Sequence, residues 1–429
     1  MNETFYKILD NGVRIVFRES TSEVAYVGVM VGVGTRDEDE KENGLAHYIE
    51  HCVFKGCTHI SQKSSEFRAT FGKNSVLTSK DIIERIEGVG GEINAYTTKE
   101  ETTFYAATGR THWKKTLELI SDMILHPTFP KEETDKEVEV ILDEIDSYED
   151  SPSELIYDDF ENIVFQGNKL AMPILGTKKS VRAISRKKET ALRFMARNYA
   201  PDKMVVFIQG NLHATQVFEY VSHVFATLPL STVNQPLINR YTPVKMTAEN
   251  RTYKKHTHQV HVMMGGRAYP IGHKKQLALY LLNNILGGGS MSSRLNLSLR
   301  EKRGLVYTIE SQYTPLSDSG YWSIYFASDA KDKDECIRLI HKELDKLCKQ
   351  PLSNKQMQRA LKQLHGQMAI SAENQENNVL AMAKLMLYHN AAPTWEETFK
   401  QIEQLQAGDL LDTAREIFTK DNLSVLTYE

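Results

Sequence analysis

The chain has 429 residues, about three times the length of an ordinary domain, which excludes one small domain and leaves two or three. Hydrophobic residues make up 41% of it and charged residues 25%. That composition provides enough apolar side chain for sizeable cores and excludes a wholly disordered chain. The net charge of 52 − 56 = −4 gives no electrostatic reason to expect a nucleic-acid partner.

The first half of the chain begins with strand patterns. Asn11-Gly12 lies between two short β patterns and predicts a hairpin. Period-two and apolar runs predict further strands, and amphipathic runs predict helices. The strands are expected at 7–9, 13–17, 24–34, 92–97, 102–107 and 204–209, and the helices at 42–55, 79–87, 113–125 and 130–148. Residues 58–79 are polar without a clear period and predict a loop excursion whose role the sequence does not indicate.

A polar segment at 229–243 contains three prolines and is predicted to be a linker. After it the same plan repeats, with strands expected at 259–266, 320–327 and 423–428 and helices at 274–286, 332–349 and 354–382. This repetition predicts an α+β protein of two tandem similar domains, each a mostly antiparallel sheet with helices packed on one face. The predicted domains are 1–228 and 244–429; a single mixed domain is the alternative.

The sequence gives no sign of a membrane or secretory segment. The longest apolar run, 24–34, has 11 residues, whereas a membrane-spanning helix needs about 20. The N-terminal segment lacks the features of a signal or transit peptide, and four cysteines without a CxxC pair indicate reduced thiols. We therefore expect a cytoplasmic protein without a membrane span; a periplasmic chain whose signal had been removed would look the same.

The strongest chemical motif is His47-Tyr48-Ile49-Glu50-His51. On a helix, residues four apart differ by about 40° in direction, so both imidazoles project from one face and can bind one zinc ion. Glu50 can then take a proton from a metal-bound water as general base. The alternative is two surface histidines beside a glutamate, a pattern expected by chance about 0.06 times in a chain of this composition.

A third ligand is needed, because a catalytic zinc usually takes three protein ligands and leaves one position for water. Glu137 and Glu144 lie seven apart in the helix expected at 130–148, within about 20° on one face, and Val140 and Ile141 are expected to pack inward beside them. Carboxylates at the edge of buried surface need a partner. We predict Glu144 as the third ligand and Glu137 as its supporting acid; the alternative is an ordinary acidic helix face.

HxxEH followed far downstream by EVxxxxxE resembles the pitrilysin/insulinase family of inverzincins, in its single-half-length subfamily of mitochondrial processing peptidase and its bacterial relatives. The resemblance implies one Zn²⁺ per chain, bound by His47, His51 and Glu144, with Glu50 as the base and Glu137 in support. The 92 residues between His51 and Glu144 exceed the usual family spacing, and we attribute the excess to the polar segment after Cys57.

Two further segments are similar to family motifs that contact substrate. Gly90–Thr97 resembles the GGxxNAxT edge strand, which implies that Asn94, Ala95 and Tyr96 pair with an extended peptide backbone. The alternative is an ordinary hairpin strand. Arg300 and Tyr307 match a pair that holds the substrate main chain and stabilises the oxyanion. The family's substrate-contacting glycine loop corresponds to Gly287, Gly288 and Gly289.

The second half has no HxxEH in the corresponding helix, so we expect it to bind no catalytic metal. The whole pattern predicts a zinc-dependent endopeptidase that hydrolyses oligopeptides or unfolded segments by glutamate-assisted attack of zinc-bound water. The resemblance implies a half-clamshell chain that pairs around a closed chamber, as a homodimer or, alternatively, a heterodimer. Other interpretations are a presequence-type processing peptidase that requires a hetero-partner, and a non-catalytic scaffold or peptide-binding member of the same fold.

Overall fold

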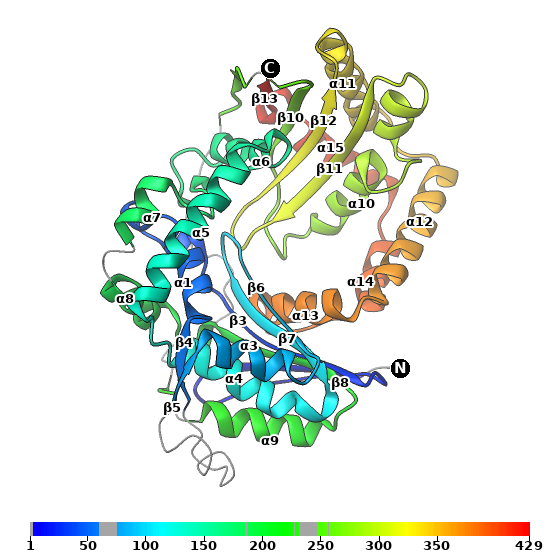
Figure 1. Cartoon of the computed structure of the whole chain (residues 1–429). Helices are drawn as coiled ribbons and strands as arrows, with labels where there is room; N and C mark the ends of the chain where they lie inside the picture. Colours follow the sequence, from blue (N-terminus) through cyan, green and yellow to red (C-terminus); the bar gives the residue numbers. More distant parts are fainter. Residues whose placement is uncertain (1–2, 60–74, 185–187, 227, 231–246, 256) are drawn as a thin grey trace. The chain divides into compact units, whose positions relative to one another are not determined.

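The computed structural model describes residues 3–59, 75–184, 188–226, 228–230, 247–255 and 257–429 (Figure 1). Their contacts group into two compact units, which we describe one at a time. The first comprises Met1–Asp146, Met172–Leu237 and Glu373–Pro393; the second comprises Ser147–Ala171, Ile238–Ala372 and Thr394–Glu429. Among the helices of the described ranges, none is both long enough and apolar enough to cross a membrane.

Within the described residues, the first unit contains a six-stranded sheet in the order β1-β2-β8-β3-β7-β6. Its strands are β1 (Thr4–Ile8), β2 (Arg14–Glu19), β3 (Val24–Val31), β6 (Glu92–Thr97), β7 (Thr102–Gly109) and β8 (Met204–Gly210). All neighbours are antiparallel except β2 and β8. The hairpin predicted at Asn11-Gly12 is confirmed, and Gly12 adopts the positive φ of 94° that such a turn requires.

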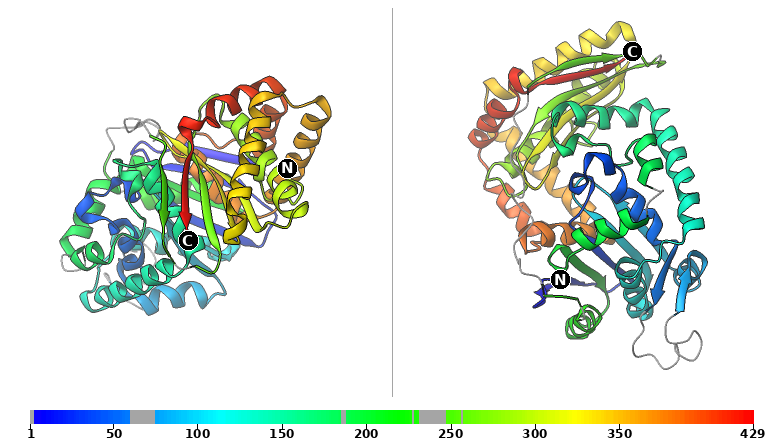
Figure 2. Two further views of the ribbon diagram at one scale, coloured as in Figure 1. Left: turned by 90° about the horizontal axis from the view of Figure 1, so that it is seen from above. Right: turned by 90° about the vertical axis from the view of Figure 1, so that its left-hand side faces the viewer.

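The described part of the second unit holds a five-stranded sheet in the order β11-β12-β10-β13-β9. The strands are β9 (Asn250–Tyr253), β10 (Val260–Arg267), β11 (Val306–Pro315), β12 (Gly320–Ser328) and β13 (Ser424–Tyr428). Here β13 and β9 are the one parallel pair, and β13 (red in Figure 2) is an inner strand. This order corresponds to β6-β7-β3-β8-β2 of the first sheet, and each pair of neighbours is parallel or antiparallel in the same way in both sheets. The predicted α+β fold with two similar domains is therefore confirmed.

Helices cover these sheets. In the first unit they are α1 (Leu45–Val53), α3 (Ser79–Glu87), α4 (Trp113–Leu125), α5 (Lys131–Glu149, whose last turn belongs to the second unit), α7 (Lys178–Ile184), α8 (Lys188–Asn198), α9 (Ala214–Phe225) and α13 (Gln375–His389). In the second they are α6 (Pro152–Val164), α10 (Gln276–Gly287), α11 (Lys333–Lys349), α12 (Asn354–Ala372), α14 (Trp395–Glu403) and α15 (Ala407–Ile417). A short hairpin of β4 (Gly56–His59) and β5 (Ser75–Thr78) precedes α3.

The helix predicted at 354–382 is wrong, because the chain breaks it into α12 and α13. The Asn374 side chain accepts a hydrogen bond from the backbone N–H of Asn377 and so starts a new helix. Helix α13 packs on β8, β2 and β3 of the first sheet (Figure 1). In β8, Val206 and Ile208 face the main core, whereas Val205 and Phe207 are buried on the opposite face.

A corresponding arrangement occurs in the second unit, where α6 packs on β10 and β13. Along β12, Trp322 and Ile324 face the main core, and Tyr321 and Tyr325 join the α6 side chain of Phe160 in a separate cluster. The prediction divided the chain into two consecutive domains, and the compact units differ from it in two segments. Ser147–Ala171 belongs to the second unit, and Glu373–Pro393 belongs to the first. The predicted linker lies mostly outside the described residues, as do residues 60–74 of the polar excursion.

A buried carboxylate anchors α13 to the first sheet. Glu101 is 2% exposed, and its side chain accepts from Lys384 Nζ at 2.5 Å and from the Tyr388 hydroxyl at 2.6 Å. We expect Lys384→Met to lower the free energy of unfolding by about 1–3 kcal/mol, because it leaves a buried acid short of a partner. Denaturant titration of Lys384→Met, Glu101→Gln and the double variant measures this. Because the two residues contact each other, the double variant should lose less free energy of unfolding than the two single variants combined. A loss equal to their sum would contradict a direct interaction between Lys384 and Glu101.

Candidate metal centre

Three side chains of the first unit direct one potential ligand atom each toward a common point. Glu144 Oε2 lies 3.6 Å from His47 Nε2 and 3.8 Å from His51 Nε2. All three ligand atoms lie within 4.8 Å of one another. Tetrahedral zinc with ligands at about 2.0–2.2 Å separates neighbouring ligand atoms by about 3.3–3.6 Å. Both distances to Glu144 are therefore close to the spacing of a zinc site, and the three residues supply the two-histidine, one-carboxylate ligand set of a catalytic zinc.

The helix that holds both histidines is fixed at its N-terminus. Gly44 precedes α1 with a φ of +92°, and a Cβ there would lie 2.7 Å from the Leu175 carbonyl oxygen, so only glycine fits. Glu38, fully buried, accepts from the backbone N–H of Ala46 at 2.7 Å and of Gly44 at 2.8 Å. Burial raises the pKa of Glu38 to about 8, against the opposing effect of these donors. Sequence reasoning missed Glu38, because it caps α1 from outside the usual N-cap position.

His47 is suited to bind a metal through its Nε2 atom. It is buried, and this burial together with the neighbouring His51 lowers its pKa to about 3. The ring is therefore neutral near pH 7, the state in which an imidazole nitrogen can coordinate a cation. Its Nδ1 atom has no hydrogen-bond partner among the described residues, so no competing interaction fixes the ring in another orientation.

His51 is held by a carboxylate on its other nitrogen. Its Nδ1 lies 3.0 Å from Glu137 Oε2, and Glu137 Oε1 lies 2.6 Å from Lys55 Nζ. Although burial acts against the charged ring, the bond to Glu137 and nearby acids raise the pKa of His51. Hydrogen bonds from His51 and Lys55 lower the pKa of Glu137 despite its burial. A carboxylate–histidine pair of this kind orients a metal ligand. Sequence reasoning found Glu137 but missed Lys55.

Glu50 lies on α1 beside the two histidines and does not join the three ligand atoms. It is 9% exposed, and burial raises its pKa. Its Oε2 accepts a hydrogen bond of 2.5 Å from Thr97 Oγ1, at the end of β6. Thr97 was absent from the predicted site residues, although it is the last residue of the GGxxNAxT segment that could have revealed it.

Helix α5 differs in one respect from its predicted packing. Ile141 is fully buried, as expected, but Val140 is 48% exposed. Viewed down the helix axis, Ile141 lies about 40° to one side of Glu137 and Val140 about 60° to the other side. The core contacts only the side of Ile141. The two carboxylates therefore lie at the edge of buried surface. Glu144 lies close to both histidines even though the polar segment after Cys57 lengthens the chain between them.

The predicted substrate-contacting residues lie in two places. Asn94, Ala95 and Tyr96 lie on β6, the edge strand beside β7. Arg300 and Tyr307 belong to the second unit and adjoin each other: the guanidinium carbon is 5.9 Å from the tyrosine ring centroid, and Tyr307 is 82% exposed. In the same unit, Gly287 is the last residue of α10, Gly288 is its C-cap, and Gly289 follows.

Comparisons with known proteins agree with this fold. Residues 14–76 and 68–178 match the family model described as "Insulinase (Peptidase family M16)", and residues 187–364 match "Peptidase M16 inactive domain". The uncharacterized zinc protease YmxG of Bacillus subtilis is 29% identical over 415 residues, covering 96% of this chain and 95% of that protein. An uncharacterized zinc protease of Rickettsia felis is 30% identical over 403 residues, and the match covers 93% of this chain and 91% of that protein.

The fold has a close counterpart among solved structures. The crystal structure of a protease from Helicobacter pylori superposes with a TM-score of 0.85 at 21% identity, covering 100% of both chains. Together with the sequence matches, this shows that the chain belongs to peptidase family M16, the insulinase family, as its motifs predicted.

The contact between Glu137 and His51 predicts an effect on metal affinity. We expect Glu137→Gln to weaken zinc binding by about 10–100-fold, because the ring of His51 loses its charged partner. Glu139→Gln is the matched control, since Glu139 is an exposed residue of the same helix. Competition with a zinc-binding dye measures both affinities; equal affinity in the two variants would contradict the orienting role.

Proposed function

We propose that the chain is a zinc-dependent endopeptidase that hydrolyses oligopeptides or unfolded segments of proteins. The observation that supports this most directly is the convergence of His47, His51 and Glu144 beside a fourth side chain, Glu50. Three protein ligands leave one position for water, which is typical of a catalytic rather than a structural zinc site. The names of the relatives as zinc proteases support the same class of activity.

In this proposal His47, His51 and Glu144 would hold the ion. A bound zinc ion would supply Lewis-acid chemistry, polarising the scissile carbonyl and lowering the pKa of a water toward about 7. Glu50 would accept the proton of the attacking water through its carboxylate and then pass it to the leaving amine. Glu137 would keep the proton of His51 on Nδ1, which leaves Nε2 as the coordinating atom.

Substrate binding would use main-chain contacts. Strand β6 is the end of its sheet, so backbone groups near Asn94, Ala95 and Tyr96 can pair with an extended peptide by β-augmentation. Arg300 and Tyr307 would hold the substrate main chain and stabilise the oxyanion, as the family resemblance implies. Main-chain recognition favours unfolded substrates and leaves side-chain preference weak. Pairing of two chains around a chamber stays a prediction.

The central experiment compares the wild type with Glu50→Gln on a short, unstructured fluorogenic peptide. We expect the wild type to cleave it, and Glu50→Gln to lose about 10²–10⁴-fold in kcat with zinc content unchanged, because the amide cannot accept a proton. Zinc is measured by mass spectrometry of the same samples. A wild type that holds one zinc per chain but cleaves nothing would reject the proposal in favour of a missing partner subunit or a binding role.

The contact between Thr97 and Glu50 yields a second prediction. Thr97→Val is close in shape but lacks the hydroxyl, so Glu50 loses the donor that holds its carboxylate. We expect kcat to fall about tenfold with KM and zinc content little changed. Thr97→Ser, which keeps the hydroxyl, serves as the matched control and should retain most of the activity. Equal losses in the two variants would show that Thr97 contributes packing rather than orientation.

A further inference from the structure

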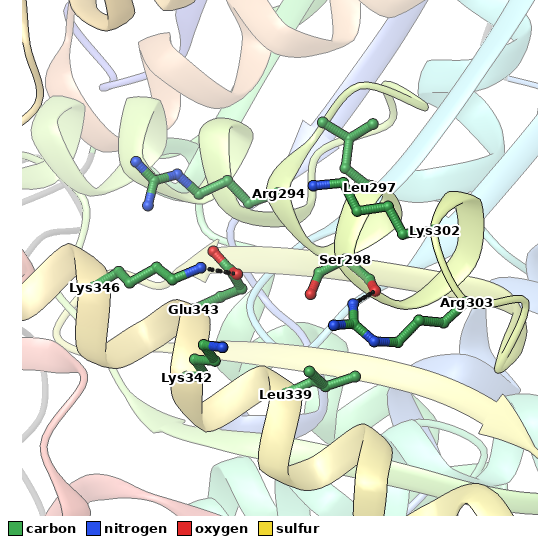
Figure 3. A pocket seen from close by; sticks show the side chains of 9 residues that line it. All are labelled: Arg294, Leu297, Ser298, Lys302, Arg303, Leu339, Lys342, Glu343 and Lys346. Carbon is green, nitrogen blue, oxygen red and sulfur yellow. Dashed lines mark hydrogen bonds and ion pairs between the residues drawn. The ribbon is translucent and has the colours of Figure 1, made fainter.

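The second unit contains a cavity of about 350 Å³ lined mainly by cations (Figure 3). It lies between α11 and a segment that includes η6 (Asn296–Glu301), a short π-helix. Side chains of the 294–303 segment lie on one side of it, and side chains of α11 lie on the other. The cationic lining residues are Arg294, Lys302, Arg303, Lys342 and Lys346.

Little negative charge balances these cations. Glu343 is the single acid among the described lining residues, which leaves a formal charge of 5 − 1 = +4. Glu343 is buried and pairs with Lys346 Nζ at 2.6 Å. Outside the lining, Glu335 pairs with Arg338 on α11, and its charge also attracts Arg303 and Lys342. Because Arg338 offsets the charge of Glu335, the cavity keeps its excess of positive charge.

Three of the cations are available to a ligand. Arg303 donates to the Ser298 carbonyl at 2.7 Å, but the side chains of Arg294, Lys302 and Lys342 have no hydrogen bond or ion pair with any described residue. Arg294 is also partly desolvated, and this burial lowers its pKa against the attraction of Glu343. A partly desolvated guanidinium binds an oxyanion more strongly than a solvated one does.

We propose that this cavity binds a small oligophosphate, a chain of two or more linked phosphate groups. Such a chain places three or four negative charges within a few ångströms, which matches the +4 of the cavity. An acidic peptide carries at most one charge per residue, so a cavity of this size would hold too little negative charge to match. Guanidinium groups bind phosphate oxygens in a bidentate manner, and ammonium groups act as point charges. Leu297 and Leu339 line the same cavity and can contact an apolar part of a ligand.

Isothermal titration calorimetry of the full, zinc-loaded chain with tripolyphosphate, ATP and adenosine tests the proposal. We expect tripolyphosphate and ATP to bind and adenosine not to bind, with affinity falling as salt is raised because the attraction is screened. Equal affinities would identify the phosphate chain alone as the ligand. Tighter binding of ATP would identify a nucleotide, whose apolar part uses Leu297 and Leu339.

Variants localise the binding. Arg294→Gln/Lys342→Gln should weaken tripolyphosphate at least about tenfold, and Glu343→Gln should strengthen it. The control Lys349→Gln/Lys355→Gln removes two cations of the same unit outside the cavity and should change affinity less than about twofold. Chelation of zinc by the ligand would appear equally in all variants. The proposal would be overturned if the cavity variant bound tripolyphosphate as tightly as the parent. It would also be overturned if the parent bound a glutamate-rich peptide but did not bind tripolyphosphate.

Discussion

The site depends on one geometric constraint: two imidazoles one turn apart on α1 must face a carboxylate on a different helix, α5. Helical periodicity accounts for the first half of this constraint, but the second half requires that both helices be fixed. Glu38 and Gly44 fix the start of α1, and the contact of Glu137 with His51 and Lys55 joins α1 to α5. Ile141 holds α5 against the core, so that Glu144 lies at the edge of buried surface. Each of these interactions therefore acts on the distance between ligand atoms.

A second connection joins Glu50, the proposed base, to the sheet. Thr97 ends the edge strand β6 and holds the carboxylate of Glu50. In the proposed function, the residue that orients the base is the last residue of the strand that pairs with substrate. A peptide bound along β6 would thus be placed in register with the group that accepts the proton. In this proposal, the backbone of β6 and the hydroxyl of Thr97 together would link substrate binding to the chemistry.

Sequence analysis predicted the local features well. The HxxEH motif, the bounds of α3 and α4, and the repeated order of strands and helices all depend on periodicity within short segments. The features it missed depend on contacts between distant residues. Glu38, Lys55 and Thr97 have no distinctive local pattern, and the break before α13 depends on a single capping residue, Asn374. The exposure of Val140 could not be predicted, because periodicity gives a face of the helix but not which side of that face the core contacts.

The account is tested most directly by anomalous diffraction at the zinc absorption edge, from crystals of the zinc-loaded chain. It predicts one zinc per chain, about 2.0–2.2 Å from His47 Nε2, His51 Nε2 and a Glu144 oxygen, with one further position taken by a non-protein oxygen. A zinc ion bound elsewhere, a site closed by a fourth protein ligand, or no peak beside these residues would contradict it.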